Sequence, residues 1–382
     1  MTRPDDKMFP FVRFTAAEFR AFFVWCAAHQ VSDVDIVGGS PVSVSRHGRR
    51  ERMSDRPVPV TSLNPLTDDL FGREVLPRVL SGVPTDRAIQ INGDVARTYG
   101  LGRGERVRLR AHLIQGTSAD EDKVISITLR VIPSEIPPFD SLNIEAALRR
   151  GMLPKSGLGF VCGETGSGKS TLLASLYRHC ADTQPDRKIV TYEDPVEYII
   201  GREDDLLPPH QAQVGRDVAS FADGLRSAMR RNPELIGIGE IRDTETAAAA
   251  VQASETGHLC LATMHTHSPG ETLPRLLGLF PPEIREAMAR AVLGVLRFIL
   301  VQVLVRTTDG KRRAVREYIV MTPGLQATLS RMPSAQWGYH LDEILRKARR
   351  RIVDQVQDML QAGDVTAEEA ALYLTEDDAD EA

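Results

Sequence analysis

Short apolar runs alternate with helix-spaced apolar residues through the second half of the chain. The runs have the length of buried strands and occur at residues 159–162, 188–192, 235–239 and 258–263. Strands that alternate with helices in this way predict an α/β fold with a parallel sheet. Two further strand-like runs, at residues 301–305 and 314–320, flank an Asp309-Gly310 pair, which predicts a hairpin.

The first third of the chain has a different pattern. Residues 16–29 have the spacing of an amphipathic helix, and the alternation over residues 106–114 and 124–132 is typical of antiparallel strands. We therefore expect a smaller α+β domain here. The predicted organisation is an N-terminal domain, a proline-rich connector, an α/β domain and an acidic mobile tail, at residues 1–132, 133–143, 144–360 and 361–382.

Composition and charge narrow the class of protein. The chain has 382 residues, a net charge of −5 and 5% aromatic residues, so direct sequence-specific nucleic-acid binding is not expected. The four cysteines lack metal-ligand spacing, so neither zinc nor disulfides are expected. The start of the chain has no apolar leader, and the longest apolar stretch, residues 291–305, is broken by Arg297 and Gln302. These features predict a cytoplasmic protein.

One motif indicates what the second domain binds. After the apolar run at 159–162, the sequence fits G-x-x-x-x-G-K-[ST] at every fixed position, and helix-spaced apolar residues follow. The motif residues are Gly163, Glu164, Thr165, Gly166, Ser167, Gly168, Lys169, Ser170 and Thr171. Backbone N–H groups and the helix N-terminus attract phosphate, Lys169 would reach the β- and γ-phosphates, and Ser170 would hold Mg²⁺. The motif predicts nucleoside triphosphate binding, without separating kinase, GTPase, helicase or motor.

Acidic and histidine residues stand next to three further strands. Glu193 and Glu240 follow apolar strands, at the edge where α/β sheets bind ligands, and His258 and His265 flank the strand that ends at Thr263. Either glutamate can orient the attacking water or hold Mg²⁺ through water, and a histidine beside the γ-phosphate can sense its presence. Each glutamate can also be an ordinary helix cap. The sequence leaves open which of the two orients the water.

The order of four boxes resembles the secretion and pilus ATPases, the motors of type II secretion, type IV pili and type IV secretion. The boxes are the phosphate loop, Thr-Tyr-Glu-Asp-Pro-Val-Glu, Gly-Glu-Ile-Arg-Asp, and Thr-Gly-His with Met-His-Thr. Residues 221–236, with 127–133 and 316–320, are similar to the DotB/TraJ branch, which powers type IVB secretion and plasmid conjugation. The pilus-retraction signature Ala-Ile-Arg-x-Gly-Lys is not recognisable.

The resemblance implies a RecA-like P-loop ATPase domain preceded by a PAS-like domain, with ATP and Mg²⁺ as cofactors. It implies a homohexamer that docks on an inner-membrane secretion or conjugation complex, at the inner face of that membrane. It also implies that Arg108, Arg110 and Arg130 reach a neighbouring subunit's nucleotide. An exposed strand face with solvated charges would explain the same arginines.

The predicted function is therefore a cytoplasmic hexameric ATPase motor for type IVB secretion or conjugal DNA transfer. The alternatives are a type IV pilus retraction or assembly ATPase and a nucleotide-gated docking scaffold. A DNA-translocating helicase would need a basic channel with stacking aromatic residues, and no basic–aromatic stretch is present. A small-molecule phosphotransferase would leave the arginines and histidines without a role.

Overall fold

The computed structural model describes residues 8–118, 122–132 and 135–374, and it forms two compact units, Met1–Glu135 and Ile136–Ala382. The boundary between the units lies inside the segment predicted as a connector. Part of that segment is folded, because Phe139–Leu142 forms a short 3₁₀ helix, η1. The buried Phe139 ring stacks on His179, with the ring centroids 4.9 Å apart.

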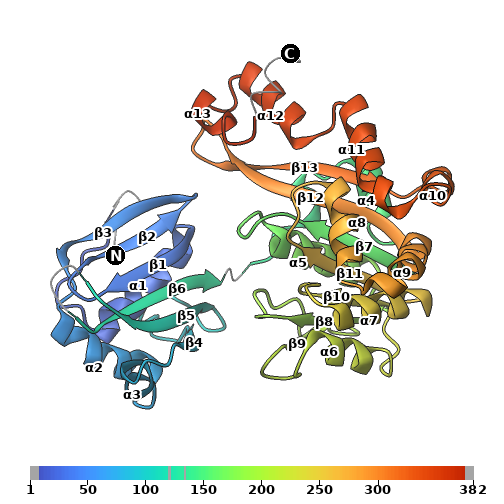
Figure 1. The fold of residues 1–382 in the computed structure, drawn as a ribbon. Helices are drawn as coiled ribbons and strands as arrows, with labels where there is room; N and C mark the ends of the chain where they lie inside the picture. The colour runs from blue at the N-terminus through green and yellow to red at the C-terminus, as the bar shows by residue number, and fades with distance from the viewer. Residues whose placement is uncertain (1–7, 119–121, 133–134, 375–382) are drawn as a thin grey trace. The chain divides into compact units, whose positions relative to one another are not determined.

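The first unit is a six-stranded antiparallel sheet with helices packed on one face (Figure 1). The strand order is β3-β2-β1-β6-β5-β4. The elements are α1 (Ala16–Ala28), β1 (Val31–Val37), β2 (Pro41–Arg46), β3 (Arg49–Pro57), α2 (Val60–Phe71), α3 (Val75–Leu80), β4 (Thr85–Asn92), β5 (Arg106–Gly116) and β6 (Val124–Ile132). Alternate residues of β5, such as Leu109 and Leu113, are buried in the core of this unit. β5 and β6 are strands of an antiparallel sheet, as their alternation predicts, and they pair directly with each other.

The second unit is built on a seven-stranded sheet in the order β13-β12-β7-β11-β10-β8-β9. The strands are β7 (Gly157–Cys162), β8 (Ile189–Glu193), β9 (His210–Gln213), β10 (Leu235–Ile238), β11 (Leu259–Met264), β12 (Leu296–Arg306) and β13 (Arg312–Val320). All neighbouring strands are parallel except β12 and β13, which form the predicted hairpin. The predicted parallel α/β sheet is therefore confirmed.

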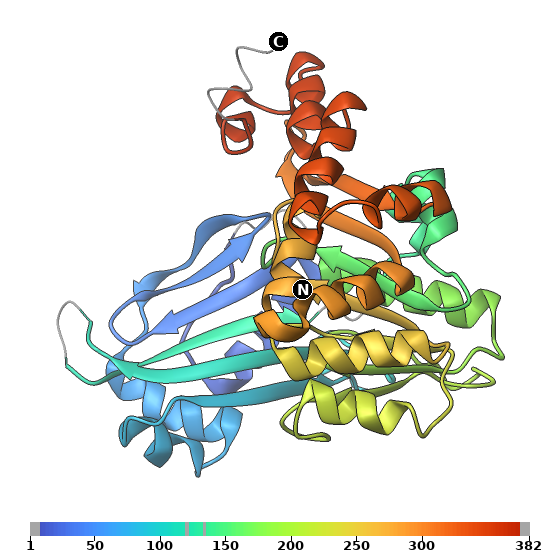
Figure 2. The ribbon, with the colours of Figure 1, turned by 45° about the vertical axis from the view of Figure 1, so that its right-hand side comes forward.

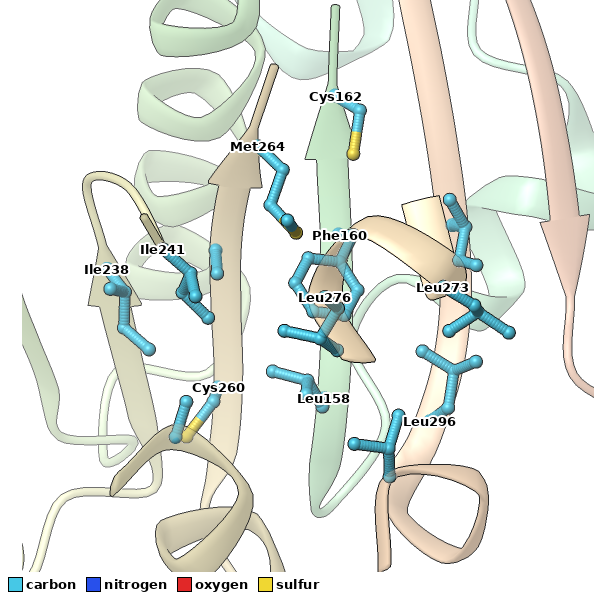
Figure 3. Close-up of a cluster of buried hydrophobic side chains, with 14 of the residues drawn as sticks. Leu158, Phe160, Cys162, Ile238, Ile241, Cys260, Met264, Leu273, Leu276 and Leu296 are labelled. Carbon is cyan, nitrogen blue, oxygen red and sulfur yellow. The ribbon is translucent and has the colours of Figure 1, made fainter. Parts of the chain in front are cut away.

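Helices cover both faces of this sheet, which explains why its central strands are apolar throughout. The helices are α4 (Ala146–Gly151), α5 (Lys169–Thr183), α6 (Phe221–Ala228), α7 (Thr244–Glu255), α8 (Pro269–Gly278) and α9 (Pro282–Val295). On one face, Phe160 of β7 and Met264 of β11 pack in a core with Leu276 of α8 (Figure 3). On the other face, Val161 packs in a core with Leu176 of α5.

The chain ends in short helices next to β13 (Figures 1 and 2). They are α10 (Pro323–Leu329), η2 (Ser334–Gln336), α11 (Trp337–Lys347), α12 (Ile352–Gln361) and α13 (Ala367–Ala370). The first part of the tail expected from residue 361 is folded, because Ala370 is buried and the buried Glu369 accepts a hydrogen bond from the Arg306 N–H. The rest of the expected tail, residues 375–382, lies outside the described residues. Within the described part of the chain, no helix is both long and apolar enough to cross a membrane.

Candidate active site

The phosphate loop connects the carboxyl end of β7 to the first residue of α5. Its backbone requires glycine: Gly166 and Gly168 both have φ of 85°, a left-handed conformation that other residues adopt at a cost. At Gly163 a Cβ would lie 2.3 Å from the backbone oxygen of Gln302, so the neighbouring strand β12 leaves no room for a side chain. Strand, loop and helix follow one another as the motif predicts.

Lys169 and Ser167 give the loop the character of an anion site. The Lys169 ammonium donates to the carbonyl oxygens of Gly163 and Glu164, at 2.7 and 2.8 Å. Burial lowers the pKa of Lys169, and the nearby carboxylates of Glu240, Glu197 and Glu164 oppose that shift. The Ser167 hydroxyl is buried and has no hydrogen-bond partner among the described residues. A bound phosphate would supply oxygen acceptors to both side chains, so these residues fit a nucleotide.

Glu240 lies at the carboxyl end of β10, and hydrogen bonds of the residues before and after it fix its backbone position. The Thr263 hydroxyl donates to the Gly239 carbonyl, and the Thr263 carbonyl accepts from the Ile241 N–H at 3.0 Å. The His265 Nε2 lies 3.8 Å from the Glu240 carboxylate. The structure therefore brings together Glu240 and His265, which follow the neighbouring strands β10 and β11.

Glu193, at the end of β8, has more polar partners than Glu240. Its Oε1 accepts hydrogen bonds from the Thr191 hydroxyl at 2.5 Å and from the Gln211 amide at 2.9 Å. Burial raises the pKa of Glu193, although these two hydrogen bonds act in the opposite direction. The two predicted glutamates thus have different neighbours: Thr191 and Gln211 donate to Glu193, whereas His265 lies near Glu240. Different neighbours suit two carboxylates to different chemical roles.

The remaining predicted loop residues face different partners. Glu164 lies 3.6 Å from the His267 ring, and both side chains are exposed. The Thr171 hydroxyl is 2.8 Å from the Tyr198 hydroxyl, whereas Ser170 is exposed at the first turn of α5. The Ser170 hydroxyl is therefore available to a Mg²⁺ ion that the motif implies, with nucleotide oxygens and water as its other ligands. Within residues 8–118, 122–132 and 135–374, no group of three or more histidine, cysteine or acidic residues can hold a metal ion.

His258 is not part of this chain's phosphate site. It precedes β11, whereas the phosphate loop follows β7, and the two parallel strands pair Leu259 with Gly157 and Met264 with Cys162. His258 therefore lies at the amino edge of the sheet, roughly 20 Å along the strand from the loop. Its ring lies 3.0 Å from the Ala253 carbonyl, and its carbonyl accepts from the Gly157 N–H. The Thr-Gly-His and Met-His-Thr motifs are close in sequence, but β11 runs between them and places the two histidines at opposite edges of the sheet.

The three predicted arginines share the open face of the first unit's sheet. Arg110 is paired directly with Arg130 across β5 and β6, and Arg108 lies two residues away on the same side. Arg110 approaches Asp86 at 3.7 Å, and Arg130 approaches Asp33 at 3.1 Å. Exposed ion pairs of this kind contribute little to stability, so Arg110 and Arg130 can exchange these partners easily.

A cavity of about 680 Å³ lies beside the phosphate loop, a volume typical of ligand sites. The loop residues 163–167 form one wall, and Val301, Glu317, Ile352 and Tyr373 contribute to the others. Burial raises the pKa of Glu317 to about 7, and its carboxylate accepts from the Ile352 N–H at 2.9 Å. The cavity is large enough for part of a nucleotide beyond its phosphates.

The sequence prediction missed four residues that lie near the phosphate loop or, in the case of Gln211, against Glu193. Glu197 lies in the predicted Thr-Tyr-Glu-Asp-Pro-Val-Glu box, so its acidic side chain was a usable signal. Gln302 also gave a signal, since it breaks an apolar stretch. Gln211 lies outside the predicted strands. Glu317 lies in the predicted strand at residues 314–320, where its charge did not by itself indicate a site residue.

Three comparisons relate this geometry to known proteins. Residues 126–370 match the family described as type II/IV secretion system protein. The uncharacterized protein YggR of Escherichia coli is 33% identical over 78% of this chain and 84% of YggR. The type IV pilus retraction ATPase PilT of Pseudomonas aeruginosa is 31% identical over 78% of this chain and 81% of PilT. The X-ray structure of the Legionella pneumophila ATPase DotB matches with a TM-score of 0.87 and 30% identity, over 96% of this chain and 98% of that one.

Proposed function

This chain belongs to the type II/IV secretion system protein family, and we propose that it is a hexameric motor for type IVB secretion or conjugal DNA transfer. Membership makes it an ATP-hydrolysing P-loop enzyme. The observation that carries the proposed choice of machine is the likeness to DotB, which extends over nearly the whole of both chains. The DotB/TraJ-like sequence segments support the same choice.

In the proposed mechanism, the phosphate loop holds ATP and Glu240 orients the attacking water. Glu240 suits this role better than Glu193, because two hydrogen bonds already engage the Glu193 Oε1. His265, 3.8 Å from Glu240, would respond to the γ-phosphate. Mg²⁺, held with the help of Ser170, would neutralise phosphate charge when bound.

The proposed ring supplies the arginines. Arg108, Arg110 and Arg130 would contact the nucleotide of a neighbouring subunit, where a guanidinium can neutralise charge on the transferring phosphoryl group. Their clustering on one sheet face supports this role, as do the solvent-accessible ion pairs of Arg110 and Arg130, which contribute little to stability. In the cell the ring would dock at the inner face of the inner membrane on a secretion or conjugation complex.

The choice of machine can be tested by deleting the gene in its own host. Wild-type and Lys169→Ala chains are then returned on a plasmid, and effector secretion, conjugal transfer and twitching motility are measured. We expect loss of secretion or transfer, rescue by the wild-type chain only, and unchanged twitching. Loss of twitching with intact secretion and transfer would contradict the proposal.

A pilus retraction or assembly ATPase is the second candidate, and the 31% identity to PilT favours it. The missing Ala-Ile-Arg-x-Gly-Lys signature argues against retraction. A nucleotide-gated docking scaffold is the third candidate. In that case Glu240→Gln would bind ATP, hydrolyse it slowly and still restore secretion in the deletion strain, whereas a motor needs turnover.

A further inference from the structure

A buried amide side chain supports the phosphate loop from the side of β12. The Gln302 side chain belongs to a residue that is 3% exposed, and its Nε2 donates to the Ser167 carbonyl at 2.7 Å. A Cβ on Gly168 would lie 2.9 Å from the same Nε2, and a Cβ on Gly163 would meet the Gln302 backbone. Gln302 therefore contacts the loop near both of its ends.

This contact determines the direction of one loop N–H group. The Ser167 carbonyl and the Gly168 N–H belong to one planar trans peptide, so they point in opposite directions. Because Gln302 holds the carbonyl toward β12, the Gly168 N–H is directed away from that strand. Phosphate loops bind anions through such N–H groups, so the orientation of this peptide affects affinity.

The other end of the Gln302 amide is fixed by a buried arginine. Arg316 on β13 is 4% exposed, and its Nε donates to the Gln302 Oε1 at 2.8 Å. If the amide flipped, two acceptors would face each other at Ser167 and two donors would face each other at Arg316. The network therefore permits one orientation of the amide.

The same arginine reaches the segment that begins the second unit. Its Nη1 donates to the Asn143 carbonyl at 3.3 Å, directly after η1. Asn143 has φ of 49°, a left-handed conformation that depends on its surroundings. A continuous chain of hydrogen bonds thus links Ser167, Gln302, Arg316 and Asn143.

We propose that Gln302 is a positioning residue for the phosphate loop, and that this chain of hydrogen bonds conveys the loop's nucleotide state to residues 139–145. A phosphate that accepts from the Gly168 N–H would pull on this peptide, and the Ser167 carbonyl belongs to the same rigid plane. The buried Gln302 and Arg316 side chains would follow the carbonyl, because leaving a buried donor unpaired costs free energy. The inference rests on nucleotide binding by the proposed ATPase, and it does not depend on which machine the ATPase drives.

The decisive variant is Gln302→Glu in the full chain. A carboxylate still accepts from Arg316, but it cannot donate to the Ser167 carbonyl. The matched control is Gln326→Glu on helix α10, because the Gln326 amide also donates to a backbone carbonyl, that of Leu293 on α9, at 3.1 Å. Gln302→Met removes the same donor without adding charge, and it replaces Gln302→Glu if that variant does not fold.

Three experiments are made: steady-state kinetics, which give KM and kcat for Mg-ATP, thermal melting, and hydrogen–deuterium exchange with and without a non-hydrolysable ATP analogue. In Gln302→Glu we expect KM to rise about tenfold, as for the loss of one buried hydrogen bond. Exchange at residues 163–169 should increase in the nucleotide-free protein. The analogue should protect residues 139–145 in the wild type and in Gln326→Glu, but not in Gln302→Glu.

Unchanged KM and unchanged loop exchange in a folded Gln302 variant would overturn the positioning role. Equal changes in Gln326→Glu would show a general loss of structure and would also overturn it. If the analogue still protected residues 139–145 in Gln302→Glu, the proposed link between the phosphate loop and these residues would be overturned. Hydrogen exchange in the nucleotide-free loop can be measured without ATP hydrolysis. If the wild type proved inactive, the proposed ATPase function would be refuted, but the exchange of residues 163–169 would still decide the role of Gln302.

Discussion

The Lys169 Nζ lies 2.7 Å from the carbonyl oxygen of Gly163, so the loop's own backbone holds the ammonium that its motif assigns to phosphate. A phosphate oxygen is a stronger partner than a neutral carbonyl for a charged donor. Nucleotide binding therefore exchanges one set of Lys169 hydrogen bonds for another within the loop. The lysine enters this exchange already ordered and partly desolvated.

Lys169→Ala should lower the rate of ATP hydrolysis by roughly 10²-fold or more, because it removes the cation that contacts the transferring phosphate. Circular dichroism and size-exclusion chromatography should show a folded, assembled protein. The control is Lys311→Ala, which removes an exposed lysine at the tip of the β12–β13 hairpin and should leave phosphate release unchanged. Normal turnover by folded Lys169→Ala would contradict the assignment of the loop.

Glu240→Gln should retain ATP binding and lose hydrolysis by at least about 10²-fold, since an amide cannot accept the proton of the attacking water. Fluorescent-nucleotide binding and phosphate release separate the two effects. Glu193→Gln is the matched comparison, with the same change after the neighbouring strand. If Glu193→Gln traps bound ATP and Glu240→Gln turns over normally, the two roles are reversed.

Hydrolysis per subunit should rise with protein concentration if arginines act on a neighbour's nucleotide, because a monomer then lacks a complete site. Mixing offers a sharper measurement. Lys169→Ala subunits keep their arginines, and Arg110→Ala subunits keep their own phosphate loop, so mixed rings should regain activity that neither variant has alone. Arg130→Ala replaces Arg110→Ala if the latter is active. Concentration-independent turnover by a monomer, with no activity gained in verified mixed rings, would exclude this mechanism.

Glu317 should make the second unit less stable as the pH rises. Its folded pKa of about 7 is above the ordinary value of 4.5, so the folded state binds more protons than the unfolded chain between these values. The free energy of unfolding should fall by roughly 3 kcal/mol over that range. Glu317→Gln stays neutral, so urea unfolding at pH 5 and pH 8 should show a smaller loss for this variant. Equal losses in both proteins, and in an exposed Glu283→Gln control, would contradict the prediction.

The sequence predicted the elements whose pattern is local. The loop between residues 162 and 169 and the strands β7, β8, β10 and β11 were found within a residue or two, because burial on both faces makes such strands apolar throughout. The stretch from Ala291 to Val305 was less readable. It divides at Leu296 into the end of α9 and the start of β12, and a continuous apolar run does not show where a helix becomes a strand.

The site was less predictable because it depends on strand direction and on contacts across the sheet. His258 and His265 are seven positions apart and stand at opposite ends of β11, so only one of them is near the loop. Gln302 is distant from the loop in sequence, and only the pairing of β12 with β7 brings it behind Ser167. Contacts of this kind follow from sheet order, which the chain's periodicity does not encode.

The two hydrogen bonds that join Thr263 to Gly239 and Ile241, the neighbours of Glu240, have an evolutionary consequence. The distance from Glu240 to the phosphate loop is set by strand register, so inserting one residue next to Glu240 would displace its carboxylate by about 3.3 Å. Loops at the amino edge of the sheet, such as residues 256–258, lie outside this constraint. Natural length variation in this domain should therefore accumulate at the amino edge, while the segment from Gly239 to Ile241 keeps its length even where its residues change.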